Sequence, residues 1–152
     1  PMTPTLATDT VQVRRVIAAP LARVWRVWTD PRWAARWSWG SEYETLAVDL
    51  ECRPGGTWRQ RIRDRASGEI WSFDGVFREV EAERLLVHTF HFTSDRGADE
   101  PPSLVRIEFA ALGDRTEIVI THAQLTERHK SGTVRGWEDI LAVVERLTGD
   151  ER

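Results

Sequence analysis

The 152-residue chain has one cysteine, one lysine and no asparagine, and it contains no long hydrophobic run. With Cys52 as the only cysteine, no internal disulfide can form, so we expect a reducing, cytoplasmic location. Without asparagine the chain has no acceptor for N-glycosylation. No apolar run approaches the ~18 residues of a transmembrane helix, so we expect no membrane span. Residues 1–10 have neither a basic start nor an apolar stretch, so we also expect no signal peptide.

The charge of the chain is slightly negative. There are 24 acidic and 21 basic residues, which gives a net charge of −3 and an isoelectric point near 5.8. Domains that bind nucleic acid are normally basic, so we expect no nucleic-acid partner. Hydrophobic residues make up 41% of the chain and charged residues 30%, a balance typical of a globular domain. A chain of this length buries ~68–70% of its unfolded surface, enough for a core that encloses a cavity.

The first part of the chain predicts one strand followed by two helices. Residues 11–17 alternate between apolar and polar, a period of two that is typical of a strand. Apolar residues at helical spacing across 20–29 predict a helix whose first position is Pro20. Asp30 and Pro31 then suit the cap and the first position of a short second helix.

The rest of the chain predicts a run of strands and a final helix. Tight turns rich in glycine separate the strands, so the sheet is predicted to be antiparallel, because parallel strands need crossover helices. Apolar residues at helical spacing from Val134 to Val144 predict a long C-terminal helix, capped by Ser131 or Thr133. The further strands are predicted at residues 43–48, 57–64, 69–80, 85–93, 103–111 and 115–123.

These elements predict a single α+β domain over residues 10–148, preceded by a mobile tail at residues 1–9. The predicted fold is a curved antiparallel sheet wrapped around the long C-terminal helix, with two short helices after the first strand. This arrangement buries the apolar faces of both the sheet and the helix.

Several short motifs follow one another in a fixed order between Val11 and Leu147. They are Ala19-Pro20 with Val24-Trp25, Trp28-Thr29-Asp30-Pro31, Arg53-Pro54-Gly55-Gly56-Thr57-Trp58, the segment from Phe73 to Val80, Glu83-Arg84-Leu85, Thr116 with Ile118, Ile120 and His122, and Gly136-Trp137. The ordered set resembles the family of homologues of the activator of heat-shock-protein ATPase, within the START-like (SRPBCC) superfamily. The resemblance implies a helix-grip fold, with a cavity between sheet and long helix that takes lipids, polyketides or other apolar small molecules. Some superfamily members are cyclases or dehydratases, many only bind, and the eukaryotic namesakes are co-chaperones.

Two segments depart from the family pattern. Glu81-Ala82-Glu83 stands where a double proline is common, and Trp37-Ser38-Trp39 separates two tryptophans that are often adjacent. The second departure follows the short second helix, where the resemblance places the mouth of the cavity. Trp37 and Trp39 are therefore predicted either as a lid over the cavity or as a corner packed on the surface.

Strand alternation places most aromatic side chains of the central strands on one face of the sheet. They either line a pocket for a flat, apolar ligand or fill the core. Gly75 and Gly136 favour a cavity, because each removes a side chain from a bulky face. We predict that Trp137 lies on the inner face of the long helix and forms part of the cavity wall. The predicted ligand-binding residues are Trp37, Trp39, Trp58, Trp71, Phe73, Phe77, His88, Phe90, Phe92, Phe109, His122, Trp137 and Leu141.

The histidines do not predict a metal site. His88 and His91 are three residues apart on a strand and point to opposite faces, so they cannot chelate one ion together. His122 follows an interior pattern, which favours a neutral, hydrogen-bonded structural role, whereas for His88 a pocket role and a structural role are both open. With no nucleophile elbow, P-loop or dinucleotide fingerprint in the sequence, we predict no catalytic residue and no cofactor.

Three functions remain open from the sequence. The first is the binding of an apolar, aromatic or polyketide-like small molecule between the sheet and the C-terminal helix. The second is an enzyme of the cyclase, dehydratase or hydrolase type in the same cavity, with His88 as the candidate polar group. The third is a co-chaperone-like protein-interaction module. We expect a small apolar ligand as the partner, and the sequence leaves a homodimer open.

Overall fold

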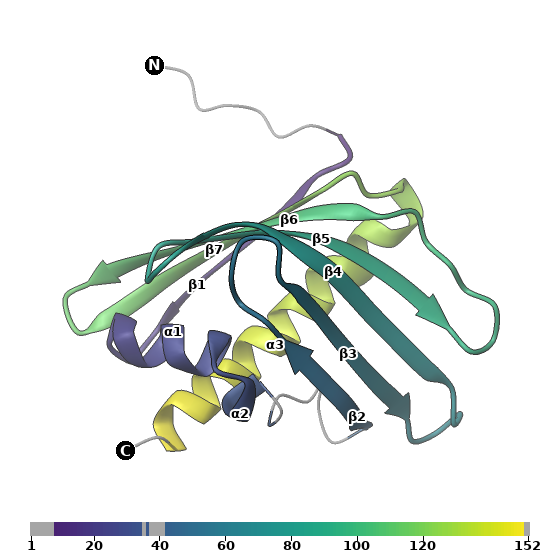
Figure 1. Ribbon diagram of the computed structural model, residues 1–152, viewed down its shortest axis with the longest axis horizontal. Coiled ribbons are helices and arrows are strands. Elements are labelled where there is room, and N and C mark those ends of the chain that lie inside the picture. Colours follow the sequence, from purple (N-terminus) through teal and green to yellow (C-terminus); the bar gives the residue numbers. More distant parts are fainter. Residues whose placement is uncertain (1–7, 35, 37–41, 151–152) are drawn as a thin grey trace.

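The computed structural model describes residues 8–34, 36 and 42–150 (Figure 1). The proposed lid residues Trp37 and Trp39 lie outside these ranges. At the start of the described chain, the backbone N–H of Leu125 donates a hydrogen bond of 2.9 Å to the Asp9 carbonyl. Residue 9, which the sequence assigned to the tail, is therefore bonded to the segment that follows the last strand.

Within the described ranges seven strands form one sheet, and the elements follow the predicted order. They are β1 (Val11–Ile17), α1 (Leu21–Thr29), α2 (Pro31–Ala34), β2 (Tyr43–Leu50), β3 (Thr57–Asp64), β4 (Ile70–Glu81), β5 (Leu85–Ser94), β6 (Ser103–Leu112), β7 (Arg115–Ala123), the 3-10 turn η1 (Glu127–His129) and α3 (Lys130–Asp150). The strand order is β1-β7-β6-β5-β4-β3-β2, and every neighbouring pair is antiparallel. The sheet curls around α3, which crosses its concave side, with α1 and α2 at one end (Figure 1). This is the α+β helix-grip fold that the sequence predicts.

The starts of the helices differ in part from the prediction. Asp30 caps α2 as expected, because its carboxylate accepts the backbone N–H of Arg32 at 2.9 Å. Pro20 is the cap of α1 and not its first helical residue. The predicted cap of the last helix is wrong, since α3 begins at Lys130 and both Ser131 and Thr133 lie inside it. The preceding turn η1 leads directly into α3, so no separate cap residue precedes the first full turn.

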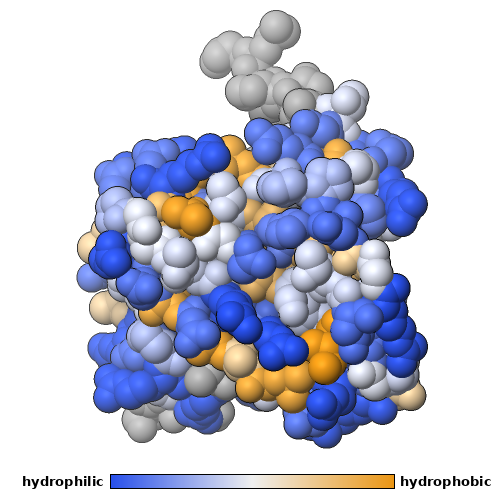
Figure 2. Space-filling model, turned by 45° about the vertical axis from the view of Figure 1, so that its right-hand side comes forward, coloured by the Kyte–Doolittle hydropathy of each residue, from blue (hydrophilic) through white to orange (hydrophobic). Residues whose placement is uncertain are grey.

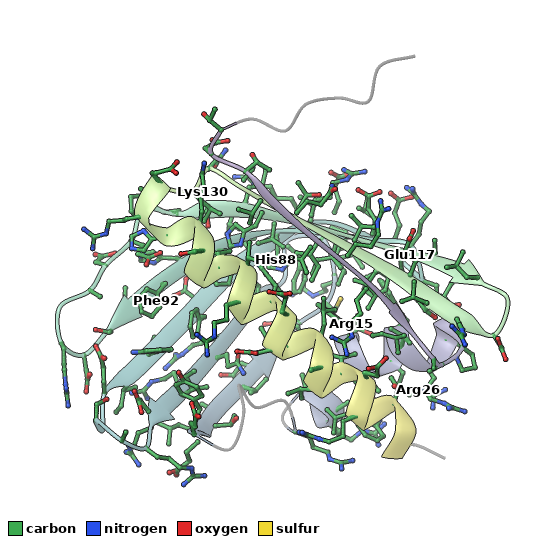
Figure 3. The ribbon with its side chains drawn as sticks, turned by 180° about the vertical axis from the view of Figure 1, so that it is seen from behind. Arg15, Arg26, His88, Phe92, Glu117 and Lys130 are labelled. Atoms are coloured by element: carbon green, nitrogen blue, oxygen red, sulfur yellow. The ribbon has the colours of Figure 1, made fainter. Side chains whose placement is uncertain are left out.

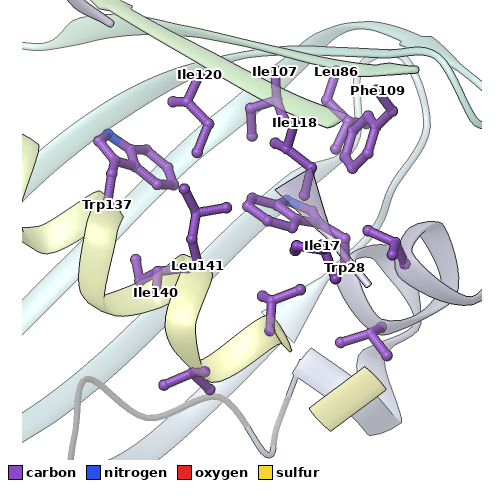
Figure 4. Packing of buried hydrophobic residues seen from close by; sticks show 14 of the residues in the cluster. Ile17, Trp28, Leu86, Ile107, Phe109, Ile118, Ile120, Trp137, Ile140 and Leu141 are labelled. Atoms are coloured by element: carbon purple, nitrogen blue, oxygen red, sulfur yellow. The ribbon is translucent and has the colours of Figure 1, made fainter. Parts of the chain in front are cut away.

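The core lies between α3 and the concave face of the sheet. Figure 4 shows Trp137, Ile140 and Leu141 of α3 facing isoleucines of β6 and β7. At the end covered by α1, the rings of Trp25 and Trp28 pack edge-on against Phe109, with centroid distances of 5.1 and 5.7 Å. The inner stripe of α3 is the one predicted from helical spacing: Trp137, Leu141 and Val144 are buried.

Apolar side chains on the surface are few and scattered. Among the described residues, the large exposed hydrophobic ones are Val16, Val76 and Leu112, which lie on three different strands. On the face shown in Figure 2, hydrophilic side chains predominate, and hydrophobic ones form only short bands between them. None of the helices within the described ranges combines the length and apolar character needed to cross a membrane.

Candidate ligand-binding site

Two adjacent cavities lie between α3 and the β3–β5 part of the sheet. We name each after the histidine in its wall: the His88 cavity has a volume of about 90 Å³, and the His122 cavity about 220 Å³. The His88 cavity extends toward α1, α2 and β2, while the His122 cavity extends toward η1 and the first turns of α3. Four side chains line both cavities: Phe73, Phe90, Trp137 and Ile140.

The structure brings most of the predicted ligand-binding residues to these two cavities. Trp58, Phe77 and His88 line the His88 cavity, and Trp71, Phe92 and His122 line the His122 cavity. Phe73, Phe90 and Trp137 line both. Phe109 and Leu141 line neither: Phe109 packs against the tryptophans of α1, and Leu141 is 1% exposed in the core.

Sequence reasoning also missed residues in the cavity walls. Ile140 lines both cavities, and Trp28 and Cys52 line the His88 cavity. Ile140 lies three residues after Trp137, so the spacing of one helical turn could have placed it beside that ring. The position of Cys52, which follows β2, gave no such signal.

Gly75 has a different role from the one expected. A Cβ atom at this position would lie 2.4 Å from Nε1 of Trp58 and 1.9 Å from the Thr89 carbonyl oxygen. The missing side chain therefore lets the indole of Trp58 lie across β4, and the space is filled by that ring. The expectation that Gly75 opens a cavity is wrong, because the space it leaves admits Trp58.

The Thr89 carbonyl accepts hydrogen bonds from two side chains. The pairing of β4 with β5 is interrupted between the pairs Asp74–His91 and Phe77–His88, and the Val76 N–H donates to the Thr89 hydroxyl at 2.9 Å. The Thr89 carbonyl oxygen accepts Nε1–H of Trp58 at 3.1 Å and bonds Nδ1 of His88 at 2.9 Å. A carbonyl oxygen only accepts, so Nδ1 of His88 carries the ring proton and Nε2 does not.

His88 is a buried, neutral side chain. It is 6% exposed, and its ring contacts those of Trp58 and Phe77 at centroid distances of 5.1 and 5.5 Å. Burial lowers the pKa of His88 to about 4, although its bond to the Thr89 carbonyl acts in the opposite direction. At neutral pH the His88 cavity thus presents a ring whose orientation and tautomer are both fixed.

His122 is bonded at both ring nitrogens. Nε1–H of Trp137 donates to Nδ1 of His122 at 3.0 Å, so Nε2 carries the proton and donates to the Ser103 hydroxyl at 2.7 Å. The Ser103 hydroxyl in turn donates to the Phe90 carbonyl at 3.2 Å. Burial, with a smaller contribution from the charge of His88, lowers the pKa of His122 to about 3. This chain of bonds gives His122 the structural role that its position in the sequence favours.

Further polar groups line the cavities, among them Asp49, Arg59 and Gln60 at the His88 cavity and Glu100 and Arg128 at the His122 cavity. At the His122 cavity, Nε2 of His129 pairs with the Glu100 carboxylate at 2.9 Å. At the His88 cavity, burial raises the pKa of the Cys52 thiol to about 11. His91 points away from both cavities and pairs with Asp99 at 2.7 Å, on the face opposite to His88 as predicted.

A family model described as "Activator of Hsp90 ATPase homolog 1-like protein" matches residues 18–149. The chain belongs to this family. The resemblance given by the sequence motifs is thereby confirmed, and the helix-grip fold is the one that structures of similar proteins have. A search of curated proteins found no match.

Similar solved structures come from several bacteria. A protein from Chromobacterium violaceum is 22% identical, with a TM-score of 0.80 over 93% of this chain and 98% of that one. An AHSA1-like protein from Aeromonas hydrophila is 24% identical, with a TM-score of 0.74 over 93% of each chain. DynU16, described as a protein in the dynemicin biosynthetic locus, is 21% identical, with a TM-score of 0.68 over 91% of this chain and 46% of that one. These likenesses establish the fold of this family member.

Proposed function

We propose that the protein binds a small, apolar, aromatic molecule in the cavities between the sheet and α3. The observation that carries the proposal is the shared wall of the two cavities, built from Phe73, Phe90, Trp137 and Ile140. Flat rings with free space on one side offer stacking and edge contacts to another aromatic ring. Ligand sites are typically concave, mainly apolar and supplied with a few placed polar groups, and this part of the interior has that composition.

The size of the cavities sets the size of the ligand. An empty apolar cavity of about 150 Å³ in another protein holds one benzene ring. The His88 cavity, at about 90 Å³, and the His122 cavity, at about 220 Å³, are of that order. Pockets for drug-sized ligands span ~300–1,000 Å³, so a molecule of several rings requires both cavities at once. The likeness to DynU16, from a biosynthetic locus, is compatible with a natural product of this kind.

The two alternative functions have less support. A catalytic role needs a polar group that can exchange a proton with the ligand. His122 is bonded at both nitrogens, and burial lowers the pKa of His88 to about 4, which makes His88 a weak base at neutral pH. A protein-interaction role needs a continuous exposed patch, whereas the exposed hydrophobic residues of the described chain, Val16, Val76 and Leu112, lie on three different strands. We therefore propose binding without catalysis as the primary activity.

The test uses p-xylene, a single-ring hydrocarbon, in isothermal titration calorimetry. Ala34, buried in the wall of the His88 cavity, is changed to phenylalanine to fill that space. Ala110, exposed on β6, receives the same substitution as a matched control. We expect p-xylene to bind, Ala34→Phe to weaken binding at least tenfold, and Ala110→Phe to leave it unchanged. Absence of p-xylene binding to the unaltered protein, or equal effects of both variants, would contradict the proposal.

A second measurement searches for the natural ligand. Native mass spectrometry of freshly purified protein would detect a co-purified small molecule as a mass above that of the chain. Denaturing the same sample releases the molecule for identification. We expect an apolar compound that contains at least one aromatic ring.

A further inference from the structure

One buried polar atom of the His88 cavity has no partner in the described part of the chain. His88 is 6% exposed, and its single hydrogen bond there runs from Nδ1 to the Thr89 carbonyl. Its other ring nitrogen, Nε2, is the unprotonated one and can only accept. Buried polar groups are nearly always hydrogen-bonded, so an acceptor of this kind in a cavity wall points to a partner that occupies the cavity.

The contrast with His122 makes this observation specific. Both histidines are buried on the same face of the sheet, and each pairs with Val105 across its neighbouring strand. His122 has its two nitrogens bonded by Trp137 and Ser103. Within the described residues, both ring nitrogens of His122 therefore have a hydrogen-bond partner, whereas Nε2 of His88, a residue that lines the His88 cavity, has none.

The His88 ring is also held in one orientation. Its Nδ1 is fixed by the Thr89 carbonyl, which also receives Nε1–H of Trp58. The rings of Trp58 and Phe77 contact it at 5.1 and 5.5 Å. Figure 3 shows His88 behind α3, on the sheet face that this helix covers. Because the ring is already held in one orientation, little conformational entropy is lost when a ligand bonds to it, and this favours a selective contact.

We propose that the His88 cavity selects aromatic molecules that carry a hydroxyl or N–H group, which donates a hydrogen bond to Nε2 of His88. The proposal rests on the proposed function and names the ligand class for that site. A carboxylate is excluded as the partner of Nε2, because an ionised carboxylate only accepts hydrogen bonds and has no proton to donate. A hydrocarbon fits the walls but leaves Nε2 unbonded, so it binds more weakly than its hydroxylated counterpart.

The experiment compares p-cresol with p-xylene, two single-ring molecules that differ by a hydroxyl in place of a methyl group. Calorimetric titration of the unaltered protein is expected to give at least tenfold tighter binding of p-cresol. 4-Methylanisole keeps the oxygen but lacks the donor, so we expect it to bind no more tightly than p-xylene. The His88→Phe variant keeps a ring but removes the acceptor. In this variant p-xylene should still bind, and the affinities for p-cresol and p-xylene should be about equal.

A second readout covers the case in which His88→Phe does not fold. The nitrogen-15 resonance of His88 Nε2 in the unaltered protein should shift when p-cresol is added and stay in place when p-xylene is added. Equal affinity for the two compounds would overturn this inference and leave the proposed function standing. Binding of neither would overturn both. A preference that persists in His88→Phe, or an unmoved Nε2 resonance at saturating p-cresol, would overturn the assignment to His88.

Discussion

The two halves of the interior are packed in different ways. Where β1, β6 and β7 meet α1, branched aliphatic side chains such as Ile17, Ile118 and Ile120 are fully buried, and the rings of α1 close on Phe109. Where β3, β4 and β5 face the first turns of α3, the side chains are mostly aromatic or histidine, and two cavities remain. We refer to these regions as the filled half and the hollow half.

The strand pairing also differs between the two halves, since it is regular in the filled half and contains register shifts in the hollow half. In the filled half, β1 pairs with β7 in an unbroken register from Val11 to Ile17, and β6 with β7 from Leu104 to Leu112. In the hollow half, the β2–β3 register shifts between Thr45 and Ala47, and the β4–β5 register shifts after Phe77. Bulges of this kind re-aim side chains and are common next to functional sites.

This difference has a physical basis. Branched aliphatic side chains interlock and fill a curved space to high density. Flat rings that meet at steep angles leave gaps, and the polar atoms of tryptophan and histidine must each find a partner in a dry interior. The hollow half is therefore held by directed hydrogen bonds at Thr89 and His122, whereas the filled half is held by close packing.

The largest expected effect compares the same truncation in each half. Phe109→Ala removes a buried ring that is contacted by two tryptophans, so we expect a loss of about 3–5 kcal/mol in the free energy of unfolding. Phe90→Ala removes a half-buried ring that already has a cavity on either side, so its loss should fall below that range. Urea unfolding of both variants measures the difference. Equal losses would show that the two halves are packed to the same density.

Acid should weaken the hollow half first. Burial lowers the pKa of His88 to about 4 and of His122 to about 3, while an unfolded histidine titrates near ~6.5. Below that pH the unfolded state binds more protons, so stability is complete above about pH 6.5 and falls as the pH decreases toward the folded pKa values. Each histidine contributes a slope of about 1.4 kcal/mol per pH unit.

Urea unfolding at pH 7, 6 and 5 measures this slope, and His88→Phe should reduce it by about half. Hydrogen bonds from Arg32 and Arg84 lower the pKa values of the Asp30 and Glu81 carboxyl groups. These carboxyl groups therefore change the stability at a pH below 5 and do not contribute between pH 6 and 5. A slope that is the same in the variant would assign the acid sensitivity to other groups.

Removing one hydrogen bond of the hollow half should have a smaller effect. Trp137→Phe keeps a ring at the cavity wall but takes away the donor to Nδ1 of His122, which leaves a buried acceptor unbonded. We expect a loss of about 1–3 kcal/mol in the free energy of unfolding. The control is the same change in a His122→Leu background, where no acceptor remains and the loss should be much smaller. Equal losses in the two backgrounds would show that the hydrogen bond contributes nothing.

The sequence predicts which side chains face the interior, but it does not predict which half of the interior they occupy. A strand has only two faces, so alternation alone assigns Trp58, Phe73 and His88 to the inner face, where the structure has them. Alternation does not say where along α3 an inner residue lies, so it predicts Phe109 as a cavity residue although Phe109 packs against the tryptophans of α1. That position depends on how the helix crosses the sheet, which is a tertiary property.

Other features of the site arise from contacts between distant elements. The bond from Trp137 to His122 joins α3 to β7, and the bond from Trp58 to Thr89 joins β3 to β5. Neither pair has a spacing that indicates a contact. A lone glycine in a strand predicts only that something approaches closely, and it does not indicate that the Thr89 carbonyl and the Trp58 indole are what lies beside Gly75.

The last prediction uses the unaltered protein and tests how accessible the His88 cavity is to a reagent in solution. Cys52, the only cysteine, lies in the wall of the His88 cavity, and burial raises the pKa of its thiol to about 11. The thiolate is the reacting form, so alkylation by iodoacetamide at pH 8 should be roughly a hundredfold slower than that of an unperturbed thiol. Because p-xylene would occupy the same cavity, saturating p-xylene should slow the reaction further, whereas it should not change the rate for glutathione in the same tube. Mass spectrometry follows the mass added to the protein over time, and the chain has no second thiol that could contribute to it. A rate equal to that of glutathione would place Cys52 in open solvent, and the His88 cavity would then be a surface groove.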